Sequence, residues 1–376
     1  MLRIIADDKI PFLRGALEPY AEVVYLPGKE ITREAVLNAD AMLIRTRTVC
    51  NENLLHGTNV RFIGTATIGF DHIDTRYCDD HNIRWTNAPG CNSSSVQQYI
   101  ASALLQVAGD FSFSLRNKTL GVIGVGNVGT KVAKLAGILG MNVLLNDPPR
   151  ARREGEGEFV KLETILRESD IVTLHVPLTI TGEDKTHHLF DREILGKMKK
   201  GSWLFNSSRG EVVDNKALSD SIRSSLTGGA VIDVWENEPE IDPILLSVVH
   251  IATPHIAGYS TDGKANGTAM VVNLLSDFFD LPHRNWFPEN VPEPVYPEIK
   301  IDGMGKTEED VIRQTFLHTY SIMEDDRKLR ASPSGFEKQR GDYPLRREFP
   351  SYSVMLTNAP ESVKSVLEMM GFRISG

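Results

Sequence analysis

The sequence has few cysteines, no long apolar run and no excess of basic residues, and each shortage excludes a class of protein. Only three cysteines occur among 376 residues, with no CxxC pair, so neither a disulfide framework nor a structural zinc site is expected. No apolar run approaches the ~20 residues of a membrane span, and the first residues lack the layout of a signal peptide. The formal net charge of -9 argues against non-specific binding to nucleic acid. We therefore expect a cytoplasmic protein with no metal, membrane or nucleic-acid partner.

A glycine-rich turn is the most informative feature that the sequence does contain. Gly124, Gly126 and Gly129 are spaced as G-x-G-x-x-G between the apolar residues 119–123 and a helix-like segment, 131–139. In a strand–turn–helix unit, the first glycine permits a sharp turn, the second admits a pyrophosphate close to the backbone, and the third lets the helix pack near its strand. The helix N-terminus offers N–H groups and partial positive charge to the phosphates. This order of elements predicts a dinucleotide-binding site.

An acidic residue beyond the turn indicates which dinucleotide is bound. Asp147 ends a second apolar run, where its carboxylate can accept hydrogen bonds from the adenosine ribose hydroxyls. That contact favours NAD over NADP. Arg150, Arg152 and Arg153 lie close by in the sequence, and a nearby arginine can instead bind the 2′-phosphate of NADP. NAD is the preferred interpretation.

Short apolar runs alternate with polar segments of helix length along most of the chain, which is typical of α/β proteins with parallel sheets. The first set of runs comprises residues 2–6, 22–26, 41–44, 60–64 and 83–85. The second set comprises residues 119–123, 142–146, 171–174, 202–206, 230–234 and 249–252. The near-continuous apolar character of the second set predicts a doubly wound (Rossmann) sheet of six or seven strands covered on both faces. Helices are expected at 95–107 and at 261–279, the latter packing back on the first domain.

The last part of the chain has a different pattern. A proline-dense stretch, residues 282–297, cannot form a helix and is expected to be a stiff linker. Beyond it, strand-like residues 298–301 and 352–357 alternate with helix-like residues 308–329 and 361–370. We expect a small α+β domain here, with subunit association as its role.

Three ionisable residues are expected at strand ends in the second set, outside the carboxyl edge where open α/β sheets bind their ligands. Arg209, Glu238 and His255 each follow one of the last three runs. Histidine is suited to remove the hydroxyl proton when an alcohol is oxidised, and Glu238 is expected to orient the ring and stabilise the imidazolium. Arg209 offers a planar fork for a substrate carboxylate. Each residue alone is compatible with an ordinary loop, but together they form a coherent set for alcohol oxidation.

Asp233, at the end of the run before Glu238, has two interpretations. Its carboxylate can accept a hydrogen bond from the nicotinamide carboxamide, or it can cap the loop that follows. The spacing alone does not distinguish the two roles.

These features occur within motifs that resemble the D-2-hydroxyacid dehydrogenase family. In the family's order, the motifs are the glycine-rich turn with Asp147, His175-Val-Pro-Leu178, Asn206-Ser-Ser-Arg-Gly-Glu-Val-Val-Asp214, Asp233-Val-Trp-Glu-Asn-Glu-Pro239 and Thr253-Pro-His-Ile-Ala-Gly258. The resemblance implies an NAD-dependent dehydrogenase with Arg209, Glu238 and His255 as its catalytic residues. It also implies which residues line the cofactor: Gly124, Gly126, Asn127, Val128, Gly129, Asp147, Val176, Ser207, Ser208, Asp233 and Gly258.

Further motifs resemble members of that family that act on a phosphorylated hydroxy acid and form homodimers through a C-terminal extension. They are Gly64-Thr-Ala-Thr-Ile-Gly-Phe-Asp-His72, Ala88-Pro-Gly-Cys-Asn92, Asp147-Pro-Pro-Arg150, Gly258-Tyr259 and Gly341-Asp-Tyr-Pro-Leu-Arg-Arg-Glu348. By this resemblance, Thr46, Thr67 and Tyr259 contact the substrate.

Four arginines are candidates for binding the substrate phosphate. Arg45 and Arg47 flank Thr46 at a strand end, where a phosphate needs cationic neighbours. Arg346 and Arg347 are further candidates, from the C-terminal extension. Surface charge is the alternative interpretation for all four.

The resemblance divides the chain into three domains. A flavodoxin-like α/β substrate-binding domain is expected from residues 1–95 with 258–285, an NAD-binding Rossmann domain from 96–257, and a dimerisation domain from 286–376. Two alternatives stay open. One is a different 2-hydroxyacid dehydrogenase, such as one acting on phosphoglycerate; the other is an NAD-sensing binding protein that kept the fold.

Overall fold

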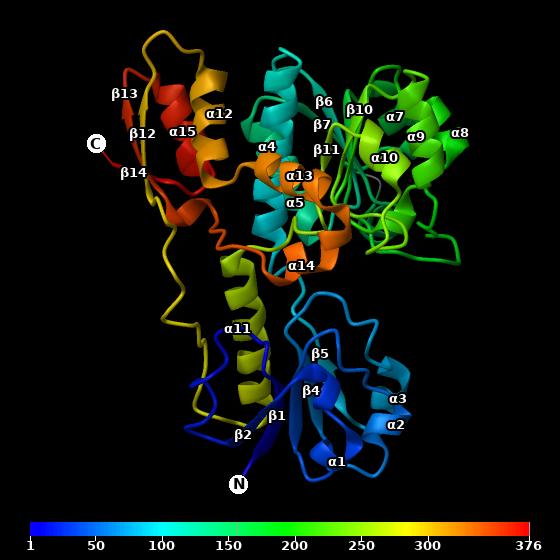
Figure 1. Ribbon diagram of the computed structural model, residues 1–376, viewed down its shortest axis with the longest axis vertical. Coiled ribbons are helices and arrows are strands. Elements are labelled where there is room, and N and C mark those ends of the chain that lie inside the picture. The colour runs from blue at the N-terminus through cyan, green and yellow to red at the C-terminus, as the bar shows by residue number, and fades with distance from the viewer. Residues whose placement is uncertain (156, 376) are drawn as a thin grey trace. The chain divides into compact units, whose positions relative to one another are not determined.

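The computed structural model describes residues 1–155 and 157–375. The chain forms two compact units: Met1–Asn92 with Ser260–Pro292, and Ser93–Tyr259 with the chain from Glu293 onward (Figure 1). Within these described ranges, no helix is long and apolar enough to cross a membrane.

The first unit is built on a five-stranded parallel sheet with the order β2-β1-β3-β4-β5, the flavodoxin-like order. Its strands are β1 (Arg3–Asp7), β2 (Glu22–Leu26), β3 (Ala41–Ile44), β4 (Phe62–Thr65) and β5 (Arg84–Thr86). Its helices are α1 (Arg33–Val36), α2 (Glu52–Leu55), α3 (Thr75–Asp80) and α11 (Thr261–Phe278), with a 3-10 turn at Gly28–Glu30.

Both faces of this sheet are buried, because neighbouring residues along each strand point to opposite faces. Ile63 packs into the core that includes residues of α1 to α3, whereas Phe62 packs against Val271 and Leu275 of α11. The predicted helix at 261–279 therefore exists and packs on the first sheet.

The second unit contains a six-stranded parallel sheet with the order β11-β10-β9-β8-β6-β7. Its strands are β6 (Thr119–Ile123), β7 (Asn142–Asn146), β8 (Ile171–Leu174), β9 (Trp203–Asn206), β10 (Gly229–Ile232) and β11 (Ile251–Ala252). A bridge between Leu145 and Phe159 extends the sheet beyond β7. The predicted doubly wound fold is confirmed.

Helices cover both faces of this sheet (Figure 1). On one face lie α4 (Ser93–Asp110) and α5 (Asn127–Ile138); on the other lie α7 (Leu162–Glu168), α8 (Arg192–Lys197), α9 (Asn215–Arg223) and α10 (Pro243–Val248). Helix α6 (Pro148–Glu154) follows β7, and Gly210–Val212 form a 3-10 turn after β9.

The C-terminal segment belongs to the second unit and adds a three-stranded parallel sheet of β12 (Glu298–Asp302), β13 (Ser353–Thr357) and β14 (Arg373–Ile374). Its helices are α12 (Glu308–Thr319), α13 (Ile322–Ala331), α14 (Phe336–Gly341) and α15 (Glu361–Met369), with 3-10 turns at Pro333–Gly335 and Phe349–Ser351. Helix α13 also holds β11, because Asp326 accepts a hydrogen bond from the Ala252 N–H at 2.7 Å.

The single helix expected at 308–329 is wrong, because the chain breaks it between α12 and α13. Tyr320 is extended there, with φ −156°. Its carbonyl oxygen accepts a hydrogen bond from Ser102 Oγ at 3.0 Å, and its hydroxyl donates to Asp325 at 3.0 Å. Tertiary contacts to α4 thus replace the helical hydrogen bonds that the local sequence favours.

Candidate active site

The loops that follow β9, β10 and β11 are hydrogen-bonded to one another at the carboxyl edge of the six-stranded sheet. The Asp233 N–H donates to the Asn206 carbonyl at 3.0 Å, and the His255 N–H donates to the Asp233 carbonyl at 2.7 Å. Arg209, Glu238 and His255 are thus carried on three consecutive, linked loops. This is the edge at which α/β sheets bind ligands.

The glycine-rich turn fits a dinucleotide. Gly124 has φ +84°, and a Cβ there would lie 2.5 Å from the His175 carbonyl oxygen. A Cβ at Gly129 would lie 2.0 Å from the Gly124 carbonyl oxygen, so this glycine lets α5 pack against the turn. At Gly126 a Cβ would meet nothing within 4 Å, and no side chain caps the start of α5. Two glycines are required by packing, and the third leaves an open approach to the helix N-terminus.

Asp147 connects the glycine-rich turn to the start of α6. Its Oδ2 accepts a hydrogen bond from the Val125 N–H at 2.8 Å, and its Oδ1 accepts from the Arg150 N–H at 3.0 Å. The carboxylate is half-buried. It is therefore held rigidly beside the turn, in the place from which a carboxylate contacts an adenosine ribose.

The three arginines that could favour NADP are each paired with a carboxylate. Glu154 lies 2.6 Å from Arg150 Nη2 and 2.5 Å from Arg153 Nη2, and Arg152 pairs with Asp184. Hydrogen bonds from Arg150 and then Arg153 lower the pKa of Glu154 to about 2, so it stays charged. These pairings offset the positive charge that a 2′-phosphate would need, in agreement with NAD as the cofactor.

His255 and Glu238 form a hydrogen-bonded pair. His255 Nδ1 lies 2.7 Å from Glu238 Oε2, and Glu238 Oε1 accepts a hydrogen bond from the Trp235 N–H at 2.9 Å. A carboxylate can only accept, so Nδ1 carries the hydrogen and Nε2 is the basic nitrogen. The pair is partly exposed, at 32% for the histidine side chain and 19% for the glutamate.

Asp233 is buried beneath the loop that carries His255. Its carboxylate accepts hydrogen bonds from Thr253 Oγ1 at 2.6 Å, the Ile256 N–H at 2.8 Å and the Ala257 N–H at 2.9 Å. These contacts support the loop-capping interpretation directly. Contact with a nicotinamide carboxamide stays a prediction.

Thr253 is also hydrogen-bonded to two aromatic side chains. Its hydroxyl lies 2.8 Å from the Tyr99 hydroxyl, and its carbonyl accepts a hydrogen bond from Trp235 Nε1 at 3.0 Å. Tyr99 lies on α4, so a buried network joins that helix to the loop. Neither aromatic side chain was assigned a role from the sequence: Tyr99 lies on a buried helix, and Trp235 entered only as part of a motif.

Arg209 lies in a turn that Asn206 braces. Asn206 Nδ2 donates to the Arg209 carbonyl at 2.9 Å, and Asn206 Oδ1 accepts from the Ser208 N–H at 3.0 Å. The half-buried Arg209 side chain donates from Nη1 to the Ser208 carbonyl at 2.8 Å. A Cβ at Gly210 would lie 2.0 Å from the backbone of Trp235, so the turn packs directly against the loop after β10.

Ser207, a predicted cofactor residue, has a buried hydroxyl without a hydrogen-bond partner among the described residues.

The other residues predicted to line the cofactor also lie at the carboxyl edge of the six-stranded sheet. Asn127 and Val128 begin α5, and Val176 follows β8 beside the glycine-rich turn. Gly258 ends the loop that carries His255. Tyr259 comes next, with its ring 5.8 Å from that of Tyr343 in an edge-on arrangement.

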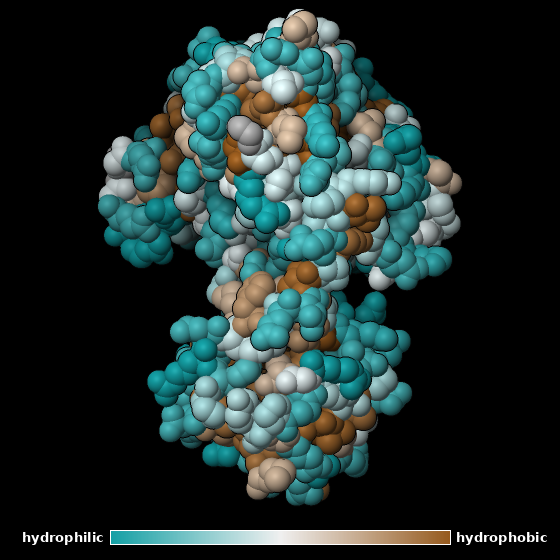
Figure 2. Space-filling view, turned by 90° about the vertical axis from the view of Figure 1, so that its left-hand side faces the viewer, coloured by the Kyte–Doolittle hydropathy of each residue, from teal (hydrophilic) through white to brown (hydrophobic). Residues whose placement is uncertain are grey.

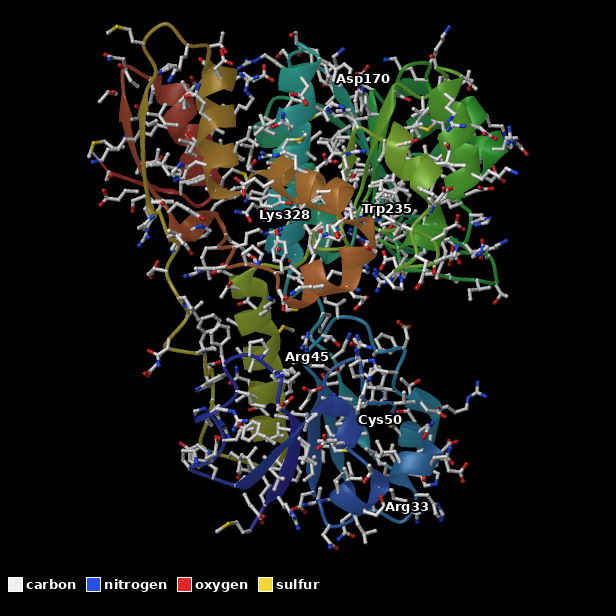
Figure 3. The ribbon with its side chains drawn as sticks, in the orientation of Figure 1. Arg33, Arg45, Cys50, Asp170, Trp235 and Lys328 are labelled. Atoms are coloured by element: carbon white, nitrogen blue, oxygen red, sulfur yellow. The ribbon has the colours of Figure 1, made fainter. Side chains whose placement is uncertain are left out.

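The first unit carries the other predicted substrate residues. Arg45, Thr46 and Arg47 follow β3, and Thr67 follows the neighbouring strand β4, so they share the carboxyl edge of that sheet. Figure 3 labels Arg45. Arg45 is half-buried, whereas Thr46 and Arg47 are exposed. Thr67 Oγ1 lies 2.7 Å from Thr65 Oγ1 and donates to the Gly69 carbonyl at 3.0 Å.

The structure adds one residue to the sequence interpretation, His175, and corrects it at Arg346 and Arg347. His175 follows β8, with Nε2 lying 3.0 Å from Thr173 Oγ1, and burial lowers its pKa to about 3, which keeps the ring neutral. Arg346 and Arg347 were offered as phosphate ligands or surface charge, and surface charge is wrong for both, at 4% and 9% exposed. Arg346 binds backbone groups that are distant in sequence, for which the sequence gives no signal.

Comparison with known proteins agrees with this geometry. The D-isomer specific 2-hydroxyacid dehydrogenase NAD-binding domain family matches residues 96–257, and a domain family of unknown function, DUF3410, matches residues 291–371. The chain belongs to the D-isomer specific 2-hydroxyacid dehydrogenase family and is an NAD-dependent dehydrogenase. The predicted family membership and cofactor are confirmed.

Two curated relatives that align over nearly the whole chain are named erythronate-4-phosphate dehydrogenase. The erythronate-4-phosphate dehydrogenase of Bacteroides thetaiotaomicron is 50% identical over 360 residues, covering 94% of this chain and 99% of the relative. That of Porphyromonas gingivalis is 39% identical over 372 residues, covering 99% and 100%. A solved D-lactate dehydrogenase from Aquifex aeolicus, complexed with NAD and lactic acid, is 26% identical, with a TM-score of 0.59 over 74% of this chain and 95% of that chain.

Proposed function

We propose that this chain oxidises 4-phospho-D-erythronate to (R)-3-hydroxy-2-oxo-4-phosphooxybutanoate with NAD, as a step toward pyridoxal 5′-phosphate. The observation that carries the chemistry is the His255–Glu238 pair at 2.7 Å, placed on the same sheet edge as the glycine-rich turn. The substrate is supported by the full-length similarity to erythronate-4-phosphate dehydrogenases.

Each residue of the proposed catalytic set has one task. His255 Nε2 takes the proton of the C2 hydroxyl, while Glu238 holds the ring through Nδ1 and stabilises the imidazolium. Arg209 binds the substrate carboxylate and polarises the neighbouring C2 oxygen. Bound NAD supplies the acceptor for the hydride that leaves C2.

The cofactor is proposed to lie along the carboxyl edge of the six-stranded sheet. Gly126 and the start of α5 bind the pyrophosphate, and Asp147 accepts from the ribose hydroxyls. The other residues proposed to line it are Gly124, Asn127, Val128, Gly129, Val176, Ser207, Ser208, Asp233 and Gly258.

The proposed substrate residues outside the catalytic set are Thr46, Thr67, Tyr259, Arg45 and Arg47. The two arginines provide charge for a phosphate, and the hydroxyl groups provide hydrogen-bond donors.

The experiment is a steady-state assay of NAD reduction with 4-phosphoerythronate, 3-phosphoglycerate and unphosphorylated erythronate. A 2-oxoacid acceptor is included in parallel, in case the cofactor stays bound between turnovers. Preference for 4-phosphoerythronate supports the proposal. Preference for 3-phosphoglycerate would retain the catalytic set and replace the substrate, and NAD binding without any turnover would favour a binding protein.

A homodimer formed through the C-terminal segment, residues 286–376, is part of the proposal. The sheet of β12 and β13 leaves Met355 exposed, and Val295, Tyr296, Met304 and Met369 are exposed elsewhere in this segment. Figure 2 faces this side of the second unit and shows hydrophobic side chains interrupting a hydrophilic surface. A mass measured in solution by light scattering tests the proposal, and a monomeric mass at assay concentrations would refute it.

We further propose a cytoplasmic location. All three cysteines are free thiols, which suits a reducing compartment.

A further inference from the structure

Arg346 connects the C-terminal segment to the loop that carries His255. It follows α14 in the sequence and is 4% exposed. Its Nη2 donates to the Ala257 carbonyl at 2.6 Å and the Ser95 carbonyl at 3.0 Å, and its Nη1 donates to the Ile256 carbonyl at 3.3 Å. The guanidinium therefore binds the two residues that come directly after His255 and the first turn of α4.

Asp233 binds the same two residues through their other backbone groups. It accepts hydrogen bonds from the N–H groups of Ile256 and Ala257, whereas Arg346 donates to their carbonyl groups. A buried anion and a buried cation thus hold one short stretch of backbone. His255 immediately precedes this stretch. Its φ of +57° is uncommon for a non-glycine residue, and such a conformation persists where the surrounding structure holds it.

The surroundings of Arg346 compensate its buried charge. Its guanidinium lies over the Tyr320 ring, 4.4 Å from the centroid. The hydroxyls of Tyr320 and Tyr343 both donate to Asp325 Oδ2, at 3.0 and 2.7 Å. The cation, the two tyrosines and the acidic neighbour, all from the C-terminal segment, therefore form one network that reaches α4 and the His255 loop.

We propose that Arg346 is a positioning residue that fixes the backbone of residues 255–257, and with it the direction in which His255 presents Nε2. The C-terminal segment then contributes to catalysis within its own chain, in addition to any role in association. This inference rests on the proposed role of His255 as the base. A lysine could not replace the arginine, because donating to carbonyls in several directions requires the planar fork.

Arg346→Lys and Arg346→Gln test the proposal in the full-length protein, with Arg330→Lys as the matched control. Arg330 also lies in the C-terminal segment and donates to backbone carbonyls, those of Leu246 at 2.6 Å and Val249 at 2.9 Å. Its carbonyl contacts precede β11, and its ion pair is with Asp326, the residue that accepts from the Ala252 N–H; none of these contacts is with residues 255–257. The control therefore weakens the same kind of hydrogen bond, on the other side of β11 in the sequence, without touching residues 255–257.

Three quantities are measured: kcat with saturating substrate, Kd for NAD, and the hydrogen-exchange rates of the Ile256 and Ala257 amides. Displacing a catalytic group by ~1 Å costs on the order of 100-fold in rate, so we expect kcat to fall roughly 10- to 100-fold in both Arg346 variants. We expect NAD affinity to fall much less than kcat, because the glycine-rich turn and Asp147, which bind the pyrophosphate and the ribose in the proposed function, are not touched. Exchange at the two amides should accelerate in both Arg346 variants, but not in Arg330→Lys.

The outcomes separate this inference from the proposed function. Normal kcat and normal exchange in Arg346→Lys and Arg346→Gln would overturn the inference, as would an equal loss of kcat in Arg330→Lys. Absence of turnover in the wild-type chain would overturn the proposed function instead, and the exchange comparison would still decide whether Arg346 holds the loop. If Arg346→Gln fails to fold, Arg346→Lys alone decides.

Discussion

His255 Nδ1 lies 2.7 Å from Glu238 Oε2, and the second oxygen of Glu238 is bound to the backbone N–H of Trp235. The carboxylate therefore spans from the loop backbone to the imidazole and fixes both the tautomer and the orientation of the ring. In the proposed function, Nε2 is therefore the atom that receives the substrate proton.

Replacing His255 by alanine removes the proposed base and should lower kcat by roughly 100- to 10,000-fold, the usual contribution of general base catalysis. NAD should bind normally. His188→Ala is the matched control, because His188 Nε2 also lies against a carboxylate, 2.6 Å from Glu236, but has no proposed part in the reaction. Stopped-flow and steady-state rates check the prediction, and an unchanged kcat in His255→Ala contradicts the assignment.

Replacing Arg209 by lysine keeps the charge but removes the fork that would bind the carboxylate. Losing a hydrogen bond to a charged group costs about 1.5–3 kcal/mol, so kcat/KM should fall roughly 10- to 150-fold. Arg223→Lys, at an exposed position at the end of α9, should behave as wild type. Near-normal kcat/KM in Arg209→Lys would show that no carboxylate clamp operates there.

Gly126→Ala should weaken NAD binding, whereas Gly129→Ala should lower the stability of the fold. A Cβ at Gly126 meets no atom within 4 Å, so the protein should fold normally but bind NAD more weakly, since the methyl group occupies the approach to the pyrophosphate. A Cβ at Gly129 would lie 2.0 Å from the Gly124 carbonyl oxygen, so stability should fall by about 1–3 kcal/mol. Thermal unfolding and NAD titration distinguish them; equal thermal stability would refute the packing argument for Gly129.

Glutamine at Glu154 should improve the use of NADP, because Arg150 and Arg153 lose their carboxylate partner and can bind a 2′-phosphate. Hydrogen bonds from Arg150 and then Arg153 lower the pKa of Glu154 to about 2. Because the pKa is lowered, these contacts stabilise the folded state at any pH above the ordinary pKa of glutamate. The stabilisation is lost as the pH falls toward about 2. The NAD preference of the wild type should therefore be independent of pH across the neutral range. KM values for both dinucleotides check this, and a preference that fails to shift in Glu154→Gln assigns the discrimination to Asp147 alone.

The sequence predicted the sheets well because most of their strands are buried on both faces and appear as short apolar runs. It failed at 308–329, where helical periodicity continues through Tyr320 and the break comes from Ser102 on a distant helix. Strand β14 has two residues, too few to give a pattern.

The candidate site was also predictable from the sequence only in part. Arg209, Glu238 and His255 were predicted to lie on neighbouring loops because parallel strands bring their carboxyl ends to one edge. Arg346 could not be predicted as a partner of the His255 loop, because it binds backbone carbonyl groups about 90 residues away. Any sequence provides such groups, so the contact has no signature.

The most direct test is transfer of the C2 hydrogen itself. The purified chain is mixed with NAD and 4-phospho-D-erythronate that carries deuterium at C2, and the NADH formed is analysed by mass spectrometry. We predict one deuterium in the reduced cofactor, formed at least about 100-fold more slowly in His255→Ala. Reduced cofactor without deuterium, or no reduction by a chain that binds both NAD and 4-phosphoerythronate, would contradict the account.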